Sequence, residues 1–460
     1  MRTSLHFPEL AERVRSQRDA LPSLYGDVDF SAQPYRLALD PDDESSLPAW
    51  VAERGELLDD DRTVELMSTA TMLGDVVADP YAALMERQSL KSLIDMLERA
   101  CREGIDAVPG APPELERFIA AMEQRPDWLD MDLVREGARQ ERIPQALLAP
   151  YVIRGAFTAT FLNTYAALPM ALTGALGGRR AARRVNETAS FFAVTTMPGA
   201  LERHGRGFAA AAMVRLMHSM VRYNALKNSG RWDLDVYGIP IPQVDQMPAG
   251  LINVYLLARR VEAAGRSDFD GRERAVVEFC RYRCFLLGLP EELLPTTPEE
   301  IIRVMHARAA TLRHDFDDEI CGELVRATMS SYLKPTRSLP DRLADAVEKS
   351  YSKFFFNRTF VNGDGEKSAA LGVAMGIEDH ALVALFAPLV FGSFWAASTT
   401  SRLPIVGGLT DRVVTEVLKQ RLASYGKPEF TTDASKYTPV AKAPATRSRE
   451  PFARALVSER

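Results

Sequence analysis

Helical periodicity runs through most of this chain, and no alternation of apolar and polar residues extends beyond a few positions. Apolar residues instead recur three and four positions apart, in segments that end near glycine, proline or asparagine. This pattern gives each segment one apolar face that can pack against other helices, and it leaves no segment patterned as a half-buried strand. The sequence therefore predicts an all-α fold, without an internal repeat.

Turn-forming residues and a change of composition divide the 460 residues into three parts. Proline and glycine at 108–113 separate an N-terminal helical extension, residues 1–115, from a larger helical domain, residues 116–424. Residues 425–460 are rich in proline, threonine and charged side chains and have little apolar periodicity. That composition predicts a disordered or surface-draped tail.

Charge and cysteine content restrict the class of protein. The net charge of −6 is spread along the chain, which gives no reason to expect nucleic-acid binding. The N-terminus shows no apolar run that could serve as a signal peptide. The cysteines have neither disulfide-framework nor zinc-site spacing, and we expect Cys280 and Cys284 to be small buried side chains. These features predict a cytoplasmic protein.

Two uncharged segments could be interpreted as membrane spans. Residues 155–178 carry threonines, an asparagine and Pro169, and residues 382–399 contain Pro388 and Gly392. We interpret both as buried core helices interrupted near their prolines. No integral membrane segment is therefore expected.

The helix predicted over 208–222 carries an unusual polar group. Arg215, His218 and Arg222 stand at positions i, i+3 and i+7, within roughly 60° of one another on one face. A buried imidazole with anion-binding guanidinium groups beside it suits a haem site, with one nitrogen for iron and two cations for propionates or a distal network. Spacing alone also permits a satisfied core histidine beside ordinary surface arginines.

Two further polar segments receive structural interpretations. Residues 231–248 are too rich in proline for regular structure, and Gln243 and Asp245 could anchor this loop through bonds to the backbone. His306, His314 and the acidic residues at 317–319 would be the ligands of a metal hydrolase or di-iron protein. No Glu-x-x-His or His-Glu-x-x-His motif accompanies them, so a solvated helix end is favoured there.

Four motifs, taken in order and spacing, resemble one known family, that of the rubber oxygenases (latex-clearing proteins) and the mycophenolic-acid-pathway oxygenases. The resemblance covers residues 126–260 well and the helical part to about 423 plausibly. The motifs are RVNET at 184–188, Pro198-Gly199, RLMHSMVR at 215–222 and YGIPIPQVD at 237–245.

The resemblance implies a globin-like helical core around one haem b, with His218 as the proximal iron ligand. Arg215 and Arg222 match arginines that flank this ligand, and Arg184 and Thr188 match a distal pair near the oxygen-binding face. It further implies an oxygenase that uses dioxygen on an apolar substrate. Without the family, Arg184 would be interpreted as a solvated cation and Thr188 as a threonine bonded back to its own helix.

The chain departs from the family pattern in three respects. The rubber oxygenases have a lysine just before the distal threonine, where this chain has Glu187, and residues 155–178 contain no acid to match their catalytic glutamate. Glu187 could replace it as a distal base, or could pair with Arg183 or Arg184. With no secretion signal, we expect a small isoprenoid or alkene-like substrate rather than extracellular rubber. A non-enzymatic haem or lipid-binding helical protein is the alternative from another class.

Overall fold

The computed structural model describes residues 4–172, 178–230 and 232–426. These residues form helices and no β-strand, with only isolated bridges between Leu37 and Leu312 and between Ser45 and Arg313. The prediction of an all-α fold is confirmed, whereas a globin-like haem-binding core stays a prediction. The predicted tail lies outside the described residues beyond residue 426.

The helices follow one another with short connections. In chain order they are α1 Pro8–Ala20, α2 Pro22–Tyr25, α3 Arg54–Leu58, α4 Asp61–Ala70, α5 Ala78–Ala83, η1 Leu84–Glu86, α6 Leu90–Glu103, η2 Ile105–Ala107, α7 Pro113–Glu123, α8 Met131–Leu147, α9 Ala149–Ala159, α10 Thr164–Leu172, α11 Gly178–Thr195, α12 Arg206–Lys227, α13 Leu234–Tyr237, α14 Gln243–Ala263, α15 Gly271–Leu286, η3 Glu291–Leu293, α16 Pro298–Thr311, η4 Asp318–Gly322, α17 Glu323–Ser330, α18 Leu339–Phe360, α19 Gly365–Ala370, α20 Ile377–Thr400 and α21 Val406–Tyr425.

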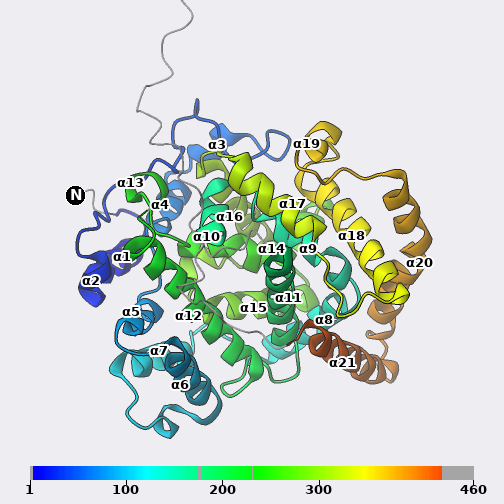
Figure 1. Ribbon diagram of the computed structural model, residues 1–460, viewed down its shortest axis with the longest axis horizontal. Helices are drawn as coiled ribbons and strands as arrows, with labels where there is room; N and C mark the ends of the chain where they lie inside the picture. Colours follow the sequence, from blue (N-terminus) through cyan, green and yellow to red (C-terminus); the bar gives the residue numbers. More distant parts are fainter. Residues whose placement is uncertain (1–3, 173–177, 231, 427–460) are drawn as a thin grey trace, which may run out of the picture.

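Helix α12 is enclosed by helices from both predicted parts of the chain (Figure 1). It contacts α5 and α6 from the N-terminal part and α10, α11 and α15 from the larger part. Alanine and methionine make up most of residues 209–220, so neighbouring helices can approach α12 closely, and most of its apolar side chains are buried. This position makes α12 suited to hold a side chain deep inside the protein.

One hydrophobic core extends across the predicted boundary near residue 115. The main cluster includes Phe7 and Leu10 at the N-terminus, Phe208 on α12, and Ile301 and Ala307 on α16. Smaller clusters lie around α9, α10 and α17, and around α8, α20 and α21. The division into three parts stays a prediction, but residues on both sides of position 115 bury their apolar surface together.

The closest helix packing joins α8 to α15 at Gly137. A Cβ atom at this position would lie 2.0 Å from the carbonyl oxygen of Ala275 and 2.6 Å from the Cβ of Phe279. Only a residue without a side chain permits this contact, because neither the backbone nor a Cβ atom can move aside on its own. The glycine therefore determines how closely the two helices approach.

Side chains cap the starts of two helices, α8 and α16. Asp130 accepts hydrogen bonds from the backbone N–H groups of Asp132 and Leu133 at the start of α8. Thr297 forms a capping box with Glu300 at the start of α16. Both caps satisfy N–H groups that an isolated helix end would leave without a partner.

The uncharged segment 155–178 is interrupted earlier than predicted. The interruption falls at residues 160–163, between α9 and α10, whereas Pro169 lies inside α10. Asn163 ends the interruption, because its side-chain oxygen accepts from the backbone N–H of Tyr165 and its backbone oxygen accepts from Ala167. Phe161, Tyr165 and their apolar neighbours are buried as expected, and residues 173–177 lie outside the described residues.

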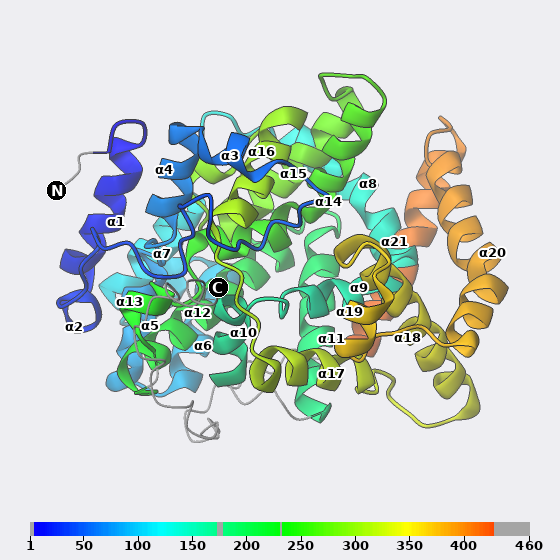
Figure 2. The ribbon, with the colours of Figure 1, turned by 90° about the horizontal axis from the view of Figure 1, so that it is seen from above.

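The interpretation of residues 382–399 as a buried core helix is wrong. Helix α20 continues through Pro388 and lies at the outer edge of the molecule, at the right in Figures 1 and 2. Within the described ranges it is the one helix long and apolar enough to cross a membrane by length and composition, and only 6% of its apolar window is buried. In the sequence, the absence of charged residues suggested a buried helix. Among the described residues, however, no further helix lies outside α20.

The proline-rich segment 231–248 is more regular than predicted. Helix α13 forms a single turn within it, and α14 begins at Gln243, six residues before the expected start at 249. Pro242 precedes the first residue of α14, where a missing N–H group costs no hydrogen bond. Residues 243–248 therefore present their side chains with helical spacing.

Candidate functional site

His218 lies on α12 and faces the first turns of α14. Its Nδ1 atom lies 2.9 Å from the Oε1 atom of Gln246, which can only accept a hydrogen bond. Nδ1 therefore carries the proton, and Nε2 carries the lone pair. No hydrogen bond to Nε2 occurs within the described residues, so this lone pair is available to an external group.

Gln246 is itself held in a fixed orientation by Gln243, which is in turn bonded to the backbone of Leu73 and Gly74. Its Nε2 donates to Oε1 of Gln243 over 2.9 Å, and the Nε2 of Gln243 donates to the carbonyl oxygen of Gly74 over 3.1 Å. The backbone N–H of Gln243 also donates to the carbonyl oxygen of Leu73. A chain of hydrogen bonds thus runs from the N-terminal part of the protein to the imidazole and determines its tautomer.

His218 is held neutral by its surroundings. Burial lowers its pKa to about 4, and the positive charges of Arg222 and Arg184 act in the same direction, while the bond to Gln246 and the charge of Asp75 oppose them. A cation is disfavoured here because the ring has little water around it and two guanidinium groups nearby. At neutral pH the side chain is therefore an imidazole with a free Nε2, as a metal ligand must be.

Arg215 and Arg222 are bound to carboxylates of the N-terminal part. Arg215 donates from Nε and Nη2 to the two carboxylate oxygens of Asp75, each over 2.7 Å. Arg222 pairs with Asp79 and donates to the carbonyl oxygens of Pro240 and Ile241. All four charged side chains are at most 5% exposed.

These ion pairs satisfy the anion requirement of both guanidinium groups within the protein. Burial raises and Arg215 lowers the pKa of Asp75, and the net result is below the usual range, so this carboxyl stays ionised. The arrangement joins α12, on either side of His218, to the segment 75–79 that leads into α5. The geometry favours a role of Arg215 and Arg222 in fixing α12, and direct contact with a cofactor stays a prediction.

Arg184, Glu187 and Thr188 lie together on α11, which packs against α12. Glu187 accepts from Arg183 Nε and from Arg184 Nη1, each over 3.2 Å. The positive charge of Arg184 contributes to the low pKa of His218, after burial and the charge of Arg222. Of the two sequence interpretations of Glu187, the ion pair is the one observed in the geometry.

Thr188 differs from two other threonines, Thr158 of α9 and Thr195 of α11. Thr158 and Thr195 donate back to carbonyl oxygens of their own helices. The Thr188 hydroxyl has no such bond in the part of the chain that the structure describes, and the residue is only partly buried. A free hydroxyl one turn from Arg184 can donate to a bound ligand.

The donor set at His218 fits a haem iron. The ring is neutral, its Nδ1–H group is oriented by an amide oxygen, and its Nε2 lone pair has no partner within the described residues. These are the properties of a proximal histidine. On α12, Val214 is partly buried one turn before His218, and on α11 Phe192 lies one turn after Thr188. One neighbouring turn on each helix is thus apolar, while the other turn carries an arginine.

Other candidate sites gain no support. No group of three His, Cys, Asp or Glu side chains suited to a metal ion occurs in the described ranges, and His306 Nε2 is hydrogen-bonded to the hydroxyl of Tyr255. The cysteines are free and buried, as predicted for Cys280 and Cys284.

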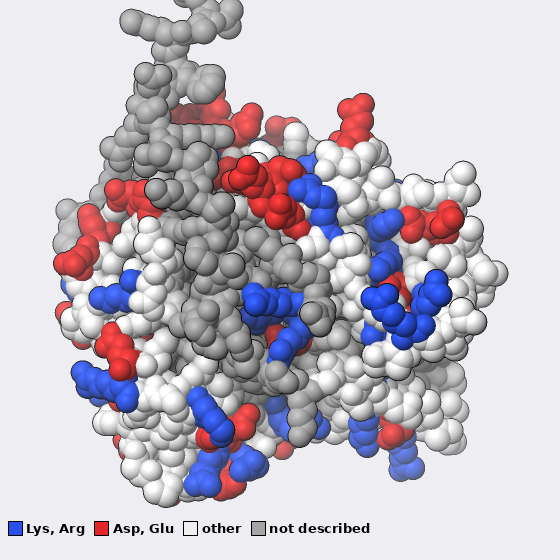
Figure 3. All heavy atoms as spheres, in the orientation of Figure 1, with Lys and Arg blue, Asp and Glu red and all other residues white. Residues whose placement is uncertain are grey.

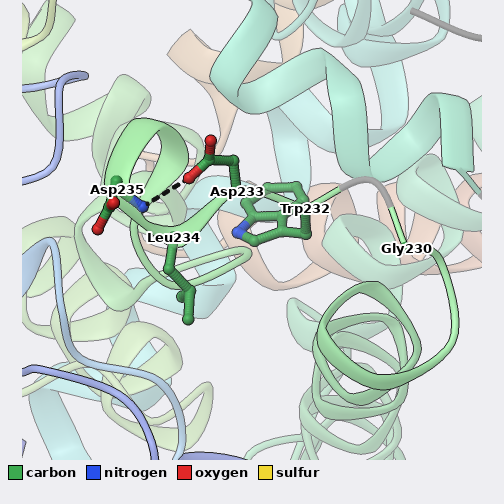
Figure 4. A pocket seen from close by; sticks show the side chains of 5 residues that line it. All are labelled: Gly230, Trp232, Asp233, Leu234 and Asp235. Atoms are coloured by element: carbon green, nitrogen blue, oxygen red, sulfur yellow. Dashed lines mark hydrogen bonds between the residues drawn. The ribbon is translucent and has the colours of Figure 1, made fainter. Parts of the chain in front are cut away.

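A shallow pocket of about 410 Å³ lies beside α13, where Asp233 accepts from the backbone N–H of Asp235 (Figure 4). None of the predicted site residues lines it, as its lining is Gly230, Trp232, Asp233, Leu234 and Asp235.

Sequence reasoning missed Gln246, Asp75 and Asp79. Gln246 follows the YGIPIPQVD motif, but its role was hidden because that segment was expected to be an irregular loop. Gln243 was expected to bond to the backbone, and it does so at Gly74, whereas Asp245 pairs with the side chains of Arg36 and Arg308 instead. The sequence did offer one indication of Asp75 and Asp79: the two aspartates are four positions apart, and Pro80 follows the second of them directly.

Comparisons with known proteins bear on the family and the fold of this chain. Residues 144–353 match the family model described as "ER-bound oxygenase mpaB/B'/Rubber oxygenase, catalytic domain". A solved structure described as "Structure of Latex Clearing Protein LCP in the closed state" has a similar fold, with a TM-score of 0.51 and 18% sequence identity over 77% of this chain and 91% of that chain. No curated protein matches the chain. The match of 144–353 contains Arg184, Glu187, Thr188, His218 and Gln246.

Proposed function

We propose that this chain is an oxygenase that uses haem b and dioxygen to oxidise a small apolar substrate, because residues 144–353 match the mpaB/rubber oxygenase catalytic-domain family model. The substrate class is an isoprenoid or another alkene. The match to an oxygenase family favours this function over the alternative of a non-enzymatic haem or lipid-binding protein. A cytoplasmic location is part of the same proposal and is supported by the free, buried cysteines.

The observation that carries the proposal is the pair formed by His218 and Gln246. Only a neutral imidazole can offer Nε2 to iron, and the Gln246 amide oxygen holds the proton on Nδ1, 2.9 Å away. Because Gln246 is fixed by Gln243, the ring need not reorient when a ligand binds. His218 would therefore be the proximal ligand.

Haem b, when bound at His218, would supply the redox chemistry that activates dioxygen. The chain's own residues would bind and orient the reactants beside it. Arg184 would direct guanidinium N–H groups toward a bound ligand, with Glu187 holding its orientation through Nη1. Thr188 would donate its hydroxyl proton in a hydrogen bond to the same ligand.

Under this proposal Glu187 could act as an ion-pair partner of the arginines or as a proton acceptor. As the partner of Arg183 and Arg184 it fixes both guanidinium groups on α11. As a carboxylate it could also accept a proton from the substrate, although both of its oxygens already accept hydrogen bonds. The first function is favoured by the contacts, and the second requires that one ion pair opens.

Apolar side chains near these groups support an apolar substrate. Phe191 and Phe192 pack edge to face with ring centroids 5.4 Å apart, and Phe192 follows Thr188 by one helical turn. Such a wall would exclude water beside the Arg184 and Thr188 donors, which strengthens their hydrogen bonds.

The first experiment is an absorption spectrum of the protein expressed with haem supply, together with pyridine-haemochrome quantitation. A Soret band with one haem b per chain, absent from His218→Ala, is the expected result. Oxygen uptake with squalene or shorter prenyl compounds then tests turnover. A His218→Ala protein with unchanged haem content would refute the assignment of the ligand, whereas haem without oxygen uptake on any alkene would refute the activity.

A further inference from the structure

An extended apolar surface covers the outer side of α20, the turn after it and the first half of α21. We call this surface the apolar edge. Trp395 is 74% exposed and Ile405 is 92% exposed, although side chains of this kind are normally buried. The large side chains of the apolar edge are Ile377, Leu385, Leu389, Phe391, Trp395, Leu403, Ile405, Val406, Leu409 and Val413.

The inner side of the same helices is packed against the protein. Val390 of α20 is buried with Val347 and Tyr351 of α18, and Phe394 packs with Val414 of α21 and Ile143 of α8. Helix α20 is therefore a fixed outer layer, as Figures 1 and 2 show, rather than a helix free to leave the fold. A contiguous apolar surface of this extent on a soluble protein marks a binding surface.

Unpaired positive charges accompany the apolar edge. Arg337 precedes α18, Arg342 and Arg358 lie on it, Arg402 follows α20, and Arg412 lies on α21; all are exposed. None of these five arginines has an ion pair within the described residues, although the chain as a whole has a net charge of −6. Figure 3 shows basic side chains beside the uncharged surface at the right-hand edge, over α18.

We propose that the apolar edge docks in the plane of a lipid bilayer that carries anionic headgroups. The exposed side of α20 would enter the boundary between headgroups and acyl chains, and the arginines would contact lipid phosphates. Trp395 suits this boundary, because indole combines a large apolar ring with one N–H donor. The turn at 403–406, with Leu403 and Ile405 beside Arg402, would insert next to it.

A second copy of the chain suits this surface less well. A twofold dimer would place the same edge of each protomer against the other, and would bring the arginines beside the axis into like-charge contact. An anionic bilayer instead satisfies the apolar side chains and the arginines together. Lipid is thus the occupant that matches both properties of the surface.

Docking would place the oxygenase at the surface of a lipid bilayer, and apolar substrates dissolve in lipid. Both helices lie beyond the matched domain at 144–353, so the apolar edge is an addition to it rather than a part of it. The proposal needs neither haem nor turnover. It can therefore fail or succeed independently of the proposed function.

Flotation with large unilamellar vesicles tests the proposal on the full chain. Vesicles of phosphatidylcholine with phosphatidylserine are expected to carry the protein upward, and the double variant Leu385→Glu/Trp395→Glu to bind them more than about tenfold less. Trp50→Glu is the matched control, because Trp50 is 55% exposed but lies far along the chain on another surface. Equal binding by the double variant and wild type would refute the proposal.

The charge requirement is tested by Arg402→Glu/Arg412→Glu. Each arginine near an anionic surface contributes roughly fivefold to binding, so the double variant should lose at least that factor on phosphatidylserine-containing vesicles. Arg274→Glu on α15, an exposed arginine away from the apolar edge, should bind like wild type. An equal loss in both variants would contradict a local charge effect.

Fluorescence and oligomeric state complete the test. Vesicles should shift the tryptophan emission to shorter wavelength, and Trp395→Phe should abolish the shift while leaving flotation largely intact. Light scattering distinguishes the competing occupant. A wild-type dimer that becomes monomeric in Leu385→Glu/Trp395→Glu, with no vesicle binding by either protein, would assign the apolar edge to a second copy and overturn the proposal.

Discussion

The Nδ1 atom of His218 and the Oε1 atom of Gln246 lie 2.9 Å apart, and this contact determines which nitrogen of the imidazole is free. The two residues come from different helices, α12 and α14, and are 28 positions apart in the chain. The chemistry of the site therefore depends on the packing of α14 as much as on the histidine. Replacing either residue tests a separate part of that relationship.

Gln246→Leu removes the acceptor of the imidazole proton without removing the ligand. We expect haem affinity to fall by about 10–100-fold, because partners of this kind orient the ring and raise its basicity. Gln246→Glu should retain haem and lower its reduction potential, since a carboxylate polarises the N–H group more strongly. Haemin titration at the Soret band measures the haem affinity, and a redox titration measures the reduction potential. Gln124→Leu, at an exposed glutamine, is the control, and a full haem affinity in Gln246→Leu would contradict the role of Gln246.

Asp75→Ala leaves the buried guanidinium of Arg215 without its anion. The folded apoprotein should lose about 3–5 kcal/mol of unfolding free energy, as measured by urea denaturation. The control Asp95→Ala breaks an exposed pair with Lys91 and should change stability little. If Arg215 instead binds a haem propionate, Asp75→Ala will leave the unfolding free energy of the apoprotein unchanged and will weaken only haem binding.

The low pKa of His218 predicts a dependence of apoprotein stability on pH. The unfolded chain binds a proton below its ordinary pKa of 6.5, whereas the folded chain does so only near 4. Folding therefore becomes less favourable as the pH falls from 6.5 towards 4, by about 2 kcal/mol. Comparing wild type with His218→Gln by urea denaturation at pH 7 and 4.5 isolates this contribution. A constant difference between the two proteins at both pH values would show that His218 is not buried as a neutral ring.

Thr188→Ala is expected to impair turnover while leaving haem in place. Loss of one hydrogen-bond donor to the reacting ligand costs about 10²–10³ in rate in sites that rely on such donors. Ser190→Ala, two residues further along α11 and therefore on another face, should retain activity. The Soret spectrum and oxygen uptake are measured on the same preparations, and loss of haem in Thr188→Ala would assign a structural function to this residue.

Gly137→Ala tests the close contact between α8 and α15. The new Cβ atom must displace the backbone at Ala275, which should cost about 3 kcal/mol of stability. Gly271→Ala, at the start of α15, meets no heavy atom within 4 Å and should be tolerated. Thermal denaturation compares the two, and equal melting temperatures would show that the helices separate easily.

Local features of the sequence predicted much of this structure. The periodicity indicated helices, and the polar face of 208–222 indicated His218, because both signals arise within one helix. Gln246 could not be identified in the same way, since its role requires knowing that α14 begins inside a proline-rich segment. Helix α20 was misjudged for a related reason: composition reports that a helix is apolar, but tertiary packing decides whether anything covers it.

The ion pairs of Arg215 and Arg222 determine how this protein can be shortened. Their carboxylate partners, Asp75 and Asp79, and the Gly74 carbonyl that holds Gln243 all precede the matched domain at 144–353. A fragment cut to the matched domain would lose the counter-ions of both guanidinium groups, the α5 and α6 helices that pack against α12, and the anchor of its histidine. The shortest gene segment that yields a folded protein is thus longer than the segment that sequence comparison recognises, and expression trials should retain the N-terminal helices.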